Sequence, residues 1–240
     1  SLGNDWISTA SRPQDPCLSE NGKIQISNQA ILLQGKLEEL GLNLSSIYSS
    51  PTIRCAQTSD LYANVTNVNS IKIEVGLVEE AKSFRGREEF EPRPNWNPLV
   101  LDKKDLYKYS NKVDMNYETM VNISWVKSDT ARNNVQEIHQ KDITISDPIH
   151  VSEFRIHELI FKIEKLLDTL EENSTILLVS HGAPVKYITT ALNNGVLYGK
   201  ALTGSFTGFA YDEHENEKNR WKPIFDEWQH SEYKGAECPK

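Results

Sequence analysis

The sequence predicts an α/β protein, a three-layer αβα sandwich around a mostly parallel central sheet. Amphipathic stretches with helical spacing alternate along the chain with short apolar stretches, as in helices that cover a sheet. One stretch, Thr175–Ser180, is a continuous apolar run, as expected of a parallel strand buried on both faces. The length of 240 residues fits one large domain, so we expect a single domain over residues 1–240.

The first elements are predicted by spacing and by helix and strand breakers. Residues 19–40 place apolar side chains three and four positions apart, which predicts an amphipathic helix with Gly41 as its C′ residue. Leu44–Ser49 predicts a short strand, and Pro51 is expected at the first position of the helix that follows. Ile71–Val75 alternates apolar and charged residues, which is typical of a strand near a sheet edge.

The middle of the chain, from about residue 81 to 150, is the least regular part. Prolines interrupt it, and only Ser128–Gln140 predicts a helix there. We interpret this segment as an insertion that covers one end of the sheet. The regular pattern then returns with two predicted helices and three predicted strands: helices at Val151–Glu172 and Ala183–Asn193, and strands at Thr175–Ser180, Ser205–Tyr211 and Trp221–Phe225.

Charge and cysteine content exclude several classes of protein. The formal net charge of −8 repels polyanions, so a nucleic-acid partner is not expected. No window approaches the roughly 18 apolar residues of a membrane span, so no membrane partner is expected either. Cys17, Cys55 and Cys238 lack the spacing of a zinc site or a disulfide scaffold, which favours a reducing, cytoplasmic compartment and no metal or other cofactor.

Two predicted junctions between a strand and a helix carry residues suited to binding an anion. Arg54 follows the first strand, and His181 follows the apolar strand that ends at Ser180. Carboxyl ends of parallel strands meet at one crevice, where helix N-termini also present free N–H groups. We therefore expect Arg54 and His181 to face one pocket.

Three motifs resemble signatures of the histidine phosphatase, or phosphoglycerate mutase-like, superfamily. They are the Ser-Pro-x-x-Arg-Cys-x-Gln-Thr stretch at 50–58, the apolar strand that ends in Ser-His-Gly at 180–182, and the Asp-Pro-Cys-Leu-Ser-Glu-Asn-Gly turn at 15–22. Trp6, the Arg12-Pro13 pair and Cys55 look most like the branch that contains the phosphatase domains of Sts/TULA-type proteins. The resemblance implies a phosphoglycerate mutase-like sandwich, which can be a homodimer, and a phosphorylated protein or small molecule as substrate.

The resemblance also implies roles for particular residues. In this superfamily the histidine of an Arg-His-Gly motif attacks phosphorus, and water then hydrolyses the phosphohistidine. By motif, Arg54 and His181 match groups that bind the phosphoryl oxygens, with Gly182 beside them. Glu79, after the Gly-Leu of Gly76-Leu77, matches the acid that protonates the leaving oxygen. Positive charge aimed at the equatorial oxygens is what stabilises such a transition state.

No Arg-His-Gly triplet occurs in the 240 residues. The nucleophile and the strand that bears it are expected just before Ser1, and without that interior strand two sheet edges lie open. The chain is therefore interpreted as a truncated or inactive phosphatase, with a pseudophosphatase interaction domain as the alternative. A mutase needs a capped pocket that residues 81–148 do not suggest, and a serine hydrolase needs a Gly-x-Ser-x-Gly elbow that is absent around Ser180.

Overall fold

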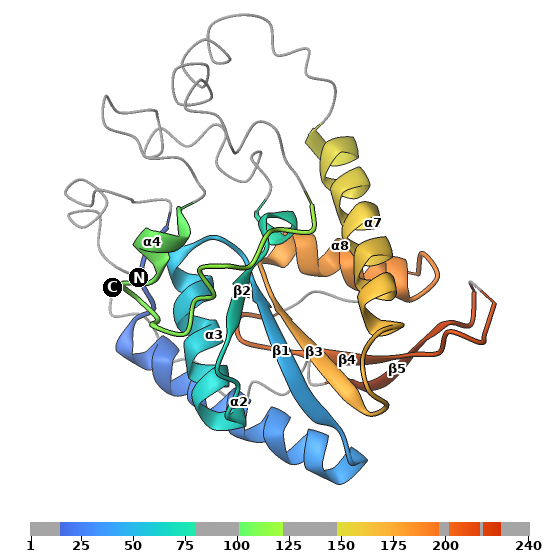
Figure 1. The fold of residues 1–240 in the computed structure, drawn as a ribbon, viewed down its shortest axis with the longest axis horizontal. Coiled ribbons are helices and arrows are strands. Elements are labelled where there is room, and N and C mark those ends of the chain that lie inside the picture. Colours follow the sequence, from blue (N-terminus) through green and yellow to red (C-terminus); the bar gives the residue numbers. More distant parts are fainter. Residues whose placement is uncertain (1–14, 80–100, 122–147, 197–201, 217, 227–240) are drawn as a thin grey trace, which may run out of the picture.

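The computed structural model is a three-layer α/β sandwich, with α2 and α3 on one face of a parallel sheet and α7 and α8 on the other (Figure 1). The structure describes residues 15–79, 101–121, 148–196, 202–216 and 218–226. The elements, in chain order, are α2 (Glu20–Leu40), β1 (Asn43–Ser49), α3 (Ile53–Thr66), β2 (Ile71–Ile73), the 3-10 turn η1 (Val75–Leu77), α4 (Lys103–Leu106), α7 (Pro148–Leu167), β3 (Ser174–Val179), α8 (Gly182–Leu192), β4 (Thr207–Tyr211) and β5 (Trp221–Asp226). The predicted helix at 128–140 lies outside the described residues.

α2 begins and ends where the sequence predicts. The Ser19 side chain accepts a hydrogen bond from the backbone N–H of Gly22, which satisfies one of the free N–H groups of the first turn. Gly41 ends the helix in the left-handed region at φ 66°, where a glycine avoids the strain of a Cβ. The buried stripe of the helix packs on the sheet: Ile26, Ala30, Leu33 and Leu37.

The three parallel strands lie in the order β2-β1-β3. The register pairs Tyr48 with Lys72 on one side of β1 and with Leu178 on the other. β2 is the edge strand that the alternation of its sequence predicts, and its outer side makes one bridge from Ile71 to Val113. Ser49 pairs with Val179, so β1 and β3 end level with one another.

α3 begins two residues later than predicted, at Ile53 instead of Pro51. Thr52 occupies the N-cap position, but its side chain makes no capping hydrogen bond. The Asp15 carboxylate takes this role, accepting the N–H of Ile53 at 2.9 and 3.1 Å. The helix therefore starts where a distant carboxylate satisfies its first free N–H, a partner that local sequence does not reveal.

The side of α7 that packs on the sheet does not carry its two phenylalanine residues. Ile156, Leu159 and Ile163 are buried against the sheet, whereas Phe154 and Phe161 are 73% and 55% exposed. Both stripes have helical spacing, so periodicity alone predicts the helix without showing which side meets the sheet.

The buried carboxylate of Glu74 ties residues 101–121 to the carboxyl end of β2. It accepts hydrogen bonds of 2.6–3.3 Å from five donors: the N–H groups of Gly76, Met120 and Val121 and the hydroxyl groups of Tyr117 and Thr119. The described part of the predicted insertion thus packs on the sheet. Burial beside this carboxylate raises the pKa of the Tyr117 hydroxyl.

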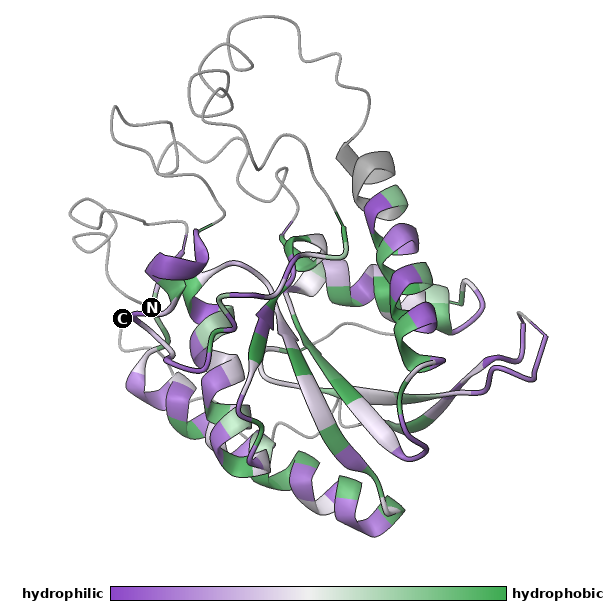
Figure 2. Cartoon of the chain, viewed as in Figure 1, coloured by the Kyte–Doolittle hydropathy of each residue, from purple (hydrophilic) through white to green (hydrophobic). Residues whose placement is uncertain are grey.

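The two faces of the sheet carry separate apolar cores. Ile47 and Leu177 point to the α2 and α3 side, and Tyr48 and Leu178 point to the α7 and α8 side. Apolar residues follow the inner sides of the helices and the strands, as Figure 2 shows. No helix in the described part of the chain is long and apolar enough to cross a membrane.

β3 is less buried than its apolar sequence predicts. Residues 174–178 are half-buried, and only Val179 is fully buried. β4 and β5 form a separate antiparallel pair, so β3 pairs within the described ranges only with β1. A cavity of about 1150 Å³ lies between β3 and β4 and exposes one side of β3.

The Glu74 network gives the first testable prediction. Glu74→Gln should lower the free energy of unfolding by about 2 kcal/mol or more, because an amide NH₂ would replace one charged acceptor in a site filled with donors. Urea unfolding would measure the loss. Glu38→Gln, at the exposed end of α2, is the matched control and should change stability by at most about 0.5 kcal/mol. Equal effects of the two changes would contradict the structural role of Glu74.

Candidate functional site

Two loops at the carboxyl ends of β1 and β3 form the candidate site. β1 ends at Ser49 and leads through residues 50–52 into α3, which carries Arg54 in its first turn. β3 ends at Val179 and leads through Ser180 to His181, the N-cap of α8. Because the two strands are parallel and end level, their loops lie side by side.

A chain of polar contacts joins Asp15, Arg54 and His181. The Arg54 guanidinium lies 3.1 Å from the Asp15 carboxylate, which is 1% exposed, and 3.0 Å from His181 Nδ1. His181 is 7% exposed, and its Nε2 lies 2.8 Å from Ser50 Oγ. The structure thus brings together Arg54 and His181, as the sequence predicts, and adds Asp15 and Ser50 as their partners.

The contacts of His181 define its protonation state. A guanidinium only donates hydrogen bonds, so Nδ1 of His181 is the acceptor and Nε2–H donates to Ser50. Burial, with the charges of Arg54 and Arg155, lowers the pKa of His181 well below its ordinary value of 6.5. The imidazole is therefore neutral at pH 7.

Cys55 lies beside the same imidazole as a buried thiol. Its Sγ is 3.6 Å from His181 Nε2 and donates to the Ser180 carbonyl at 3.7 Å. Burial raises the pKa of the Cys55 thiol to about 11, so the thiol stays protonated near neutral pH.

Glu79 and Gly182 line the same cavity as Arg54 and His181. Glu79 is half-buried at the end of the segment that follows η1, and Gly182 is exposed at the first turn of α8. The backbone before Glu79 is held on two sides: the Ser180 hydroxyl donates to the Leu77 carbonyl at 2.7 Å, and Arg155 donates to the Val78 carbonyl at 2.7 Å.

Comparison with known proteins identifies the fold of the chain. No protein-family model and no curated protein matches the sequence. Among solved structures, the ecdysone phosphate phosphatase of Bombix mori, in complex with tungstate, matches with a TM-score of 0.55 and 15% identity over 89% of this chain and 73% of that one. The chain has the phosphoglycerate mutase-like fold.

Two mycobacterial proteins have structures similar to this one. One is named mycobacterial hydrolase 2, with a TM-score of 0.52 and 17% identity over 89% of this chain and 80% of that one. The other is a glucosyl-3-phosphoglycerate phosphatase in complex with VO₃, with a TM-score of 0.50 and 17% identity over 92% and 93% of the two chains. At these identities the similarity is one of fold.

Within this phosphoglycerate mutase-like fold, Arg155 on α7 is a site residue that sequence reasoning missed. It is 5% exposed, donates to the carbonyl next to Glu79, and lies near enough to His181 to lower the pKa of the imidazole. Arg155 stands between Phe154 and Ile156 in an amphipathic stretch, and this pattern does not show that the arginine side chain is buried. The only available signal was a charged residue inside a strongly apolar stretch of helix, because buried arginines are uncommon without a partner or a function.

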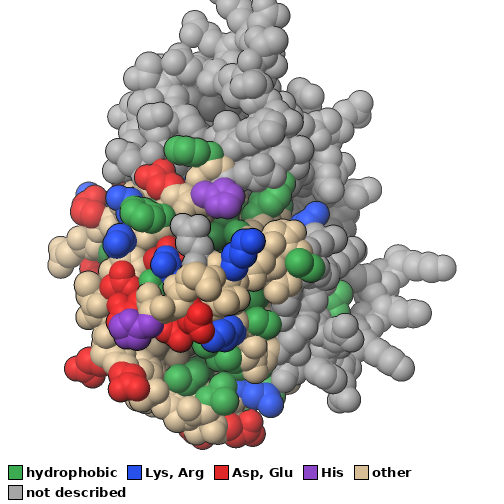
Figure 3. Space-filling view, turned by 90° about the vertical axis from the view of Figure 1, so that its right-hand side faces the viewer, with side chains coloured by type: hydrophobic (Ala, Val, Ile, Leu, Met, Phe, Trp, Pro, Cys, Tyr) green, Lys and Arg blue, Asp and Glu red, His purple; other side chains and the backbone are tan. Residues whose placement is uncertain are grey.

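The arrangement suits a small anion. Arg54 and the backbone at the start of α8 line the same end of the cavity, where an anion gains charge-assisted hydrogen bonds. Among the residues described, no three potential metal-ligating side chains cluster together. By contrast, acidic, basic and apolar side chains are interspersed on the face shown in Figure 3.

The neutral imidazole gives the second testable prediction. Unfolded His181 takes up a proton below about pH 6.5, whereas the folded chain does so only at lower pH. The unfolded state therefore binds more protons in that interval, and stability that is fully present above pH 6.5 is lost as the pH falls. From pH 7 to 5.5, wild type should lose about 1 kcal/mol more than His181→Gln in urea unfolding. An equal loss in both proteins would mean that His181 is not buried in its neutral form.

Proposed function

We propose that this chain is a histidine phosphatase domain that binds phosphoryl groups between Arg54, His181 and the N-terminus of α8. The observation that carries the proposal is the 3.0 Å contact between Arg54 and His181 at the level ends of two parallel strands. A phosphoryl group has three anionic oxygens that can accept from the Arg54 guanidinium, from an imidazole N–H and from backbone N–H groups.

The structural neighbours support a phosphoryl ligand. Two of the three are named as phosphatases, of ecdysone phosphate and of glucosyl-3-phosphoglycerate, and their structures hold tungstate and VO₃. Both oxyanions resemble phosphate in charge and shape. We propose a phosphorylated small molecule or protein as the substrate class. The Sts/TULA-type branch is a further proposal, supported by Cys55, which follows Arg54 directly in the sequence and lies 3.6 Å from His181 Nε2.

The proposed roles follow from the contacts. Arg54 holds phosphoryl oxygens and is aimed by Asp15, and His181 donates through Nε2 to an oxygen that would displace the Ser50 hydroxyl. Glu79, on the rim, would protonate the leaving oxygen. Gly182 offers backbone without a side chain at the start of α8.

We propose that the nucleophile of the covalent step is not among the 240 residues. Nδ1 of His181 accepts from Arg54 and Nε2 carries the proton, so neither ring nitrogen has a free lone pair with which to attack phosphorus. Cys55 is buried and protonated. The chain as given would therefore bind phosphoryl groups without hydrolysing them at enzymatic rates, as a truncated or inactive form.

The alternative function is a pseudophosphatase interaction domain, which the absence of Arg-His-Gly from the sequence favours. Such a domain would bind a phosphorylated partner through the same pocket and release it unchanged. We also propose a reducing, cytoplasmic location, supported by the free thiols of Cys17 and Cys55. We also propose that the chain can form a homodimer.

The third testable prediction concerns anion binding. Arg54→Ala should weaken tungstate or phosphate binding about tenfold or more, equivalent to about 1.4 kcal/mol, as measured by calorimetry. Arg54→Lys, which keeps a charge beside the buried Asp15, should weaken binding less and guards against loss of folding. Arg220→Ala is the matched control, since Arg220 pairs with Glu164 and does not line the cavity that holds Arg54. Equal anion affinity in wild type and Arg54→Ala would refute the pocket.

The fourth testable prediction concerns turnover of an aryl phosphate. The 240-residue chain should be nearly inactive, and a chain extended at its N-terminus by an apolar strand ending in Arg-His-Gly should be active. Loss of a covalent nucleophile commonly costs several orders of magnitude in rate. In the extended chain, Glu79→Gln should lower kcat by about 10²-fold or more. If the 240-residue chain turns over at ~1–10³ s⁻¹ and His181→Ala abolishes this, His181 is the nucleophile instead.

A further inference from the structure

The backbone that leads to Glu79 is held at two successive carbonyl groups. The Ser180 hydroxyl donates to the Leu77 carbonyl at 2.7 Å. An N–H of the Arg155 guanidinium donates to the Val78 carbonyl, also at 2.7 Å. The side chains of Leu77 and Val78 are themselves completely buried. Backbone in connecting segments is usually satisfied by water, so two side-chain donors at adjacent carbonyls mark a segment whose position is fixed.

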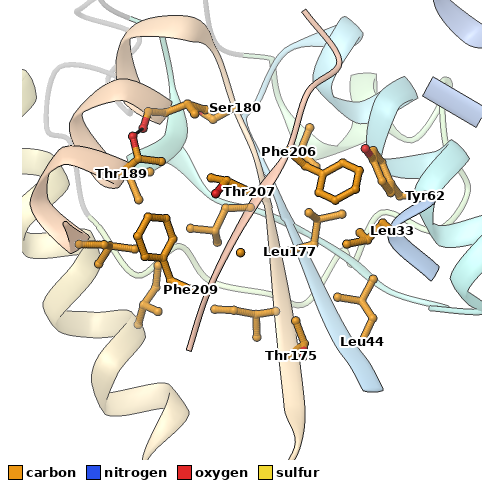
Figure 4. A pocket seen from close by; sticks show the side chains of 18 of the residues that line it. Leu33, Leu44, Tyr62, Thr175, Leu177, Ser180, Thr189, Phe206, Thr207 and Phe209 are labelled. Atoms are coloured by element: carbon orange, nitrogen blue, oxygen red, sulfur yellow. Dashed lines mark hydrogen bonds between the residues drawn. The ribbon is translucent and has the colours of Figure 1, made fainter. Parts of the chain in front are cut away.

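The Ser180 hydrogen bond ties this segment to the loop that carries the imidazole. Ser180 follows β3 and directly precedes His181, the N-cap of α8. Figure 4 shows Ser180 at one end of the cavity, beyond Leu177 of β3. Glu79 lies two residues after Leu77, and two residues of extended chain span at most about 7 Å. The hydrogen bond therefore keeps Glu79 near His181, within the range of charge interaction.

The Arg155 hydrogen bond ties the same segment to α7. Because α7 leads into β3, it begins at the level of the carboxyl ends of the strands, and Arg155 lies about two turns from that beginning (Figure 1). About one turn further along α7, Leu159 packs on η1, where a Cβ at Gly76 would lie 3.3 Å from its Cδ1. The long side chain of Arg155 therefore reaches the chain just after η1, where the Val78 carbonyl lies.

Burial of this arginine costs free energy that packing alone would not require. Arg155 is buried, and a charged side chain loses its hydration in the interior. An apolar side chain in its place would pack as Ile156 and Leu159 do, without that loss. The guanidinium also acts on the pocket, because its charge, after burial and Arg54, contributes to the lowered pKa of His181. A charged group therefore lies where it meets both the segment of Glu79 and the imidazole.

We propose that Arg155 and Ser180 are positioning residues, which hold Glu79 beside the phosphoryl pocket through the carbonyls of Val78 and Leu77. Arg155 does not line the cavity, so it acts through the place of the Glu79 carboxyl group. A general acid must lie within hydrogen-bond reach of the oxygen that it protonates, and a misplacement of about 1 Å is costly. The role of Glu79 as that acid rests on the proposed function, whereas its position beside a bound anion can be measured directly.

The fifth testable prediction uses sulfate, a dianion at neutral pH, to locate the Glu79 carboxylate. In the 240-residue chain at low salt, Glu79→Gln should strengthen sulfate binding at least about threefold, because it removes a like charge from beside the anion. In the Arg155→Met chain, Glu79→Gln should change the affinity by less than about 1.5-fold, because the carboxylate is no longer held there. Calorimetry on the four proteins measures this double-mutant cycle.

The cycle separates positioning from a direct effect of charge. If Arg155 acted only through its own charge, Arg155→Met would weaken sulfate binding equally with and without Glu79→Gln, and that result would overturn the proposal. Arg155→Lys keeps an N–H donor for the Val78 carbonyl and should restore a Glu79→Gln effect of at least about twofold. Lys162→Met removes a charge from the exposed side of α7 and, as the matched control, should leave the effect unchanged.

Two further variants complete the test. Should Arg155→Met fail to fold, Ser180→Ala removes only the hydroxyl that holds Leu77 and should reduce the Glu79→Gln effect below about twofold; an unchanged effect would overturn the proposal. Arg54→Ala tests the proposed function separately. If it leaves sulfate affinity unchanged, the phosphoryl pocket fails, and the positioning role fails with it. If it weakens binding while Glu79→Gln has no effect in wild type, the pocket stands and the positioning role alone fails.

Discussion

The carboxylate of Asp15 is the group on which the candidate site depends. It is almost completely buried, and it accepts both the first free N–H of α3 and the guanidinium of Arg54. One acidic side chain therefore fixes where the helix starts and where its arginine points. Arg54 in turn fixes the tautomer of His181 by donating to Nδ1. Three segments far apart in the sequence are thus held in one geometry, which is the preorganisation that binding a small anion requires.

The burial of β3 differs from what its sequence predicts. A continuous apolar sequence belongs in the middle of a sheet, yet five of the six residues of β3 are only half-buried. The side of β3 towards β4 borders a cavity of about 1150 Å³, whereas its other side pairs with β1. The partial exposure of β3 therefore reflects its place in the fold and not its sequence.

Local sequence patterns predict much of the fold. Ser19 and Gly41 bound α2 because caps act through neighbouring backbone, and the apolar run of β3 shows its strand directly. The contact between Arg54 and His181 could be predicted because each residue follows a strand, and parallel strands end at the same edge of a sheet. Asp15 as the cap of α3 was not predictable, since the partner lies 38 residues away. The burial of Arg155 was not predictable, because periodicity does not show which side of a helix packs on the sheet.

The pairing of Tyr48 with Leu178 has a consequence for how the protein folds. β1 meets β2 across about 24 residues of chain but meets β3 across about 130, so the two sides of one strand differ greatly in contact order. Closing the longer loop costs more chain entropy and waits for most of the polypeptide to be synthesised. The unit from α2 to β2 can therefore condense first, with one edge of β1 open. Arg54 belongs to that early unit and His181 does not, which makes assembly of the pocket a late folding step.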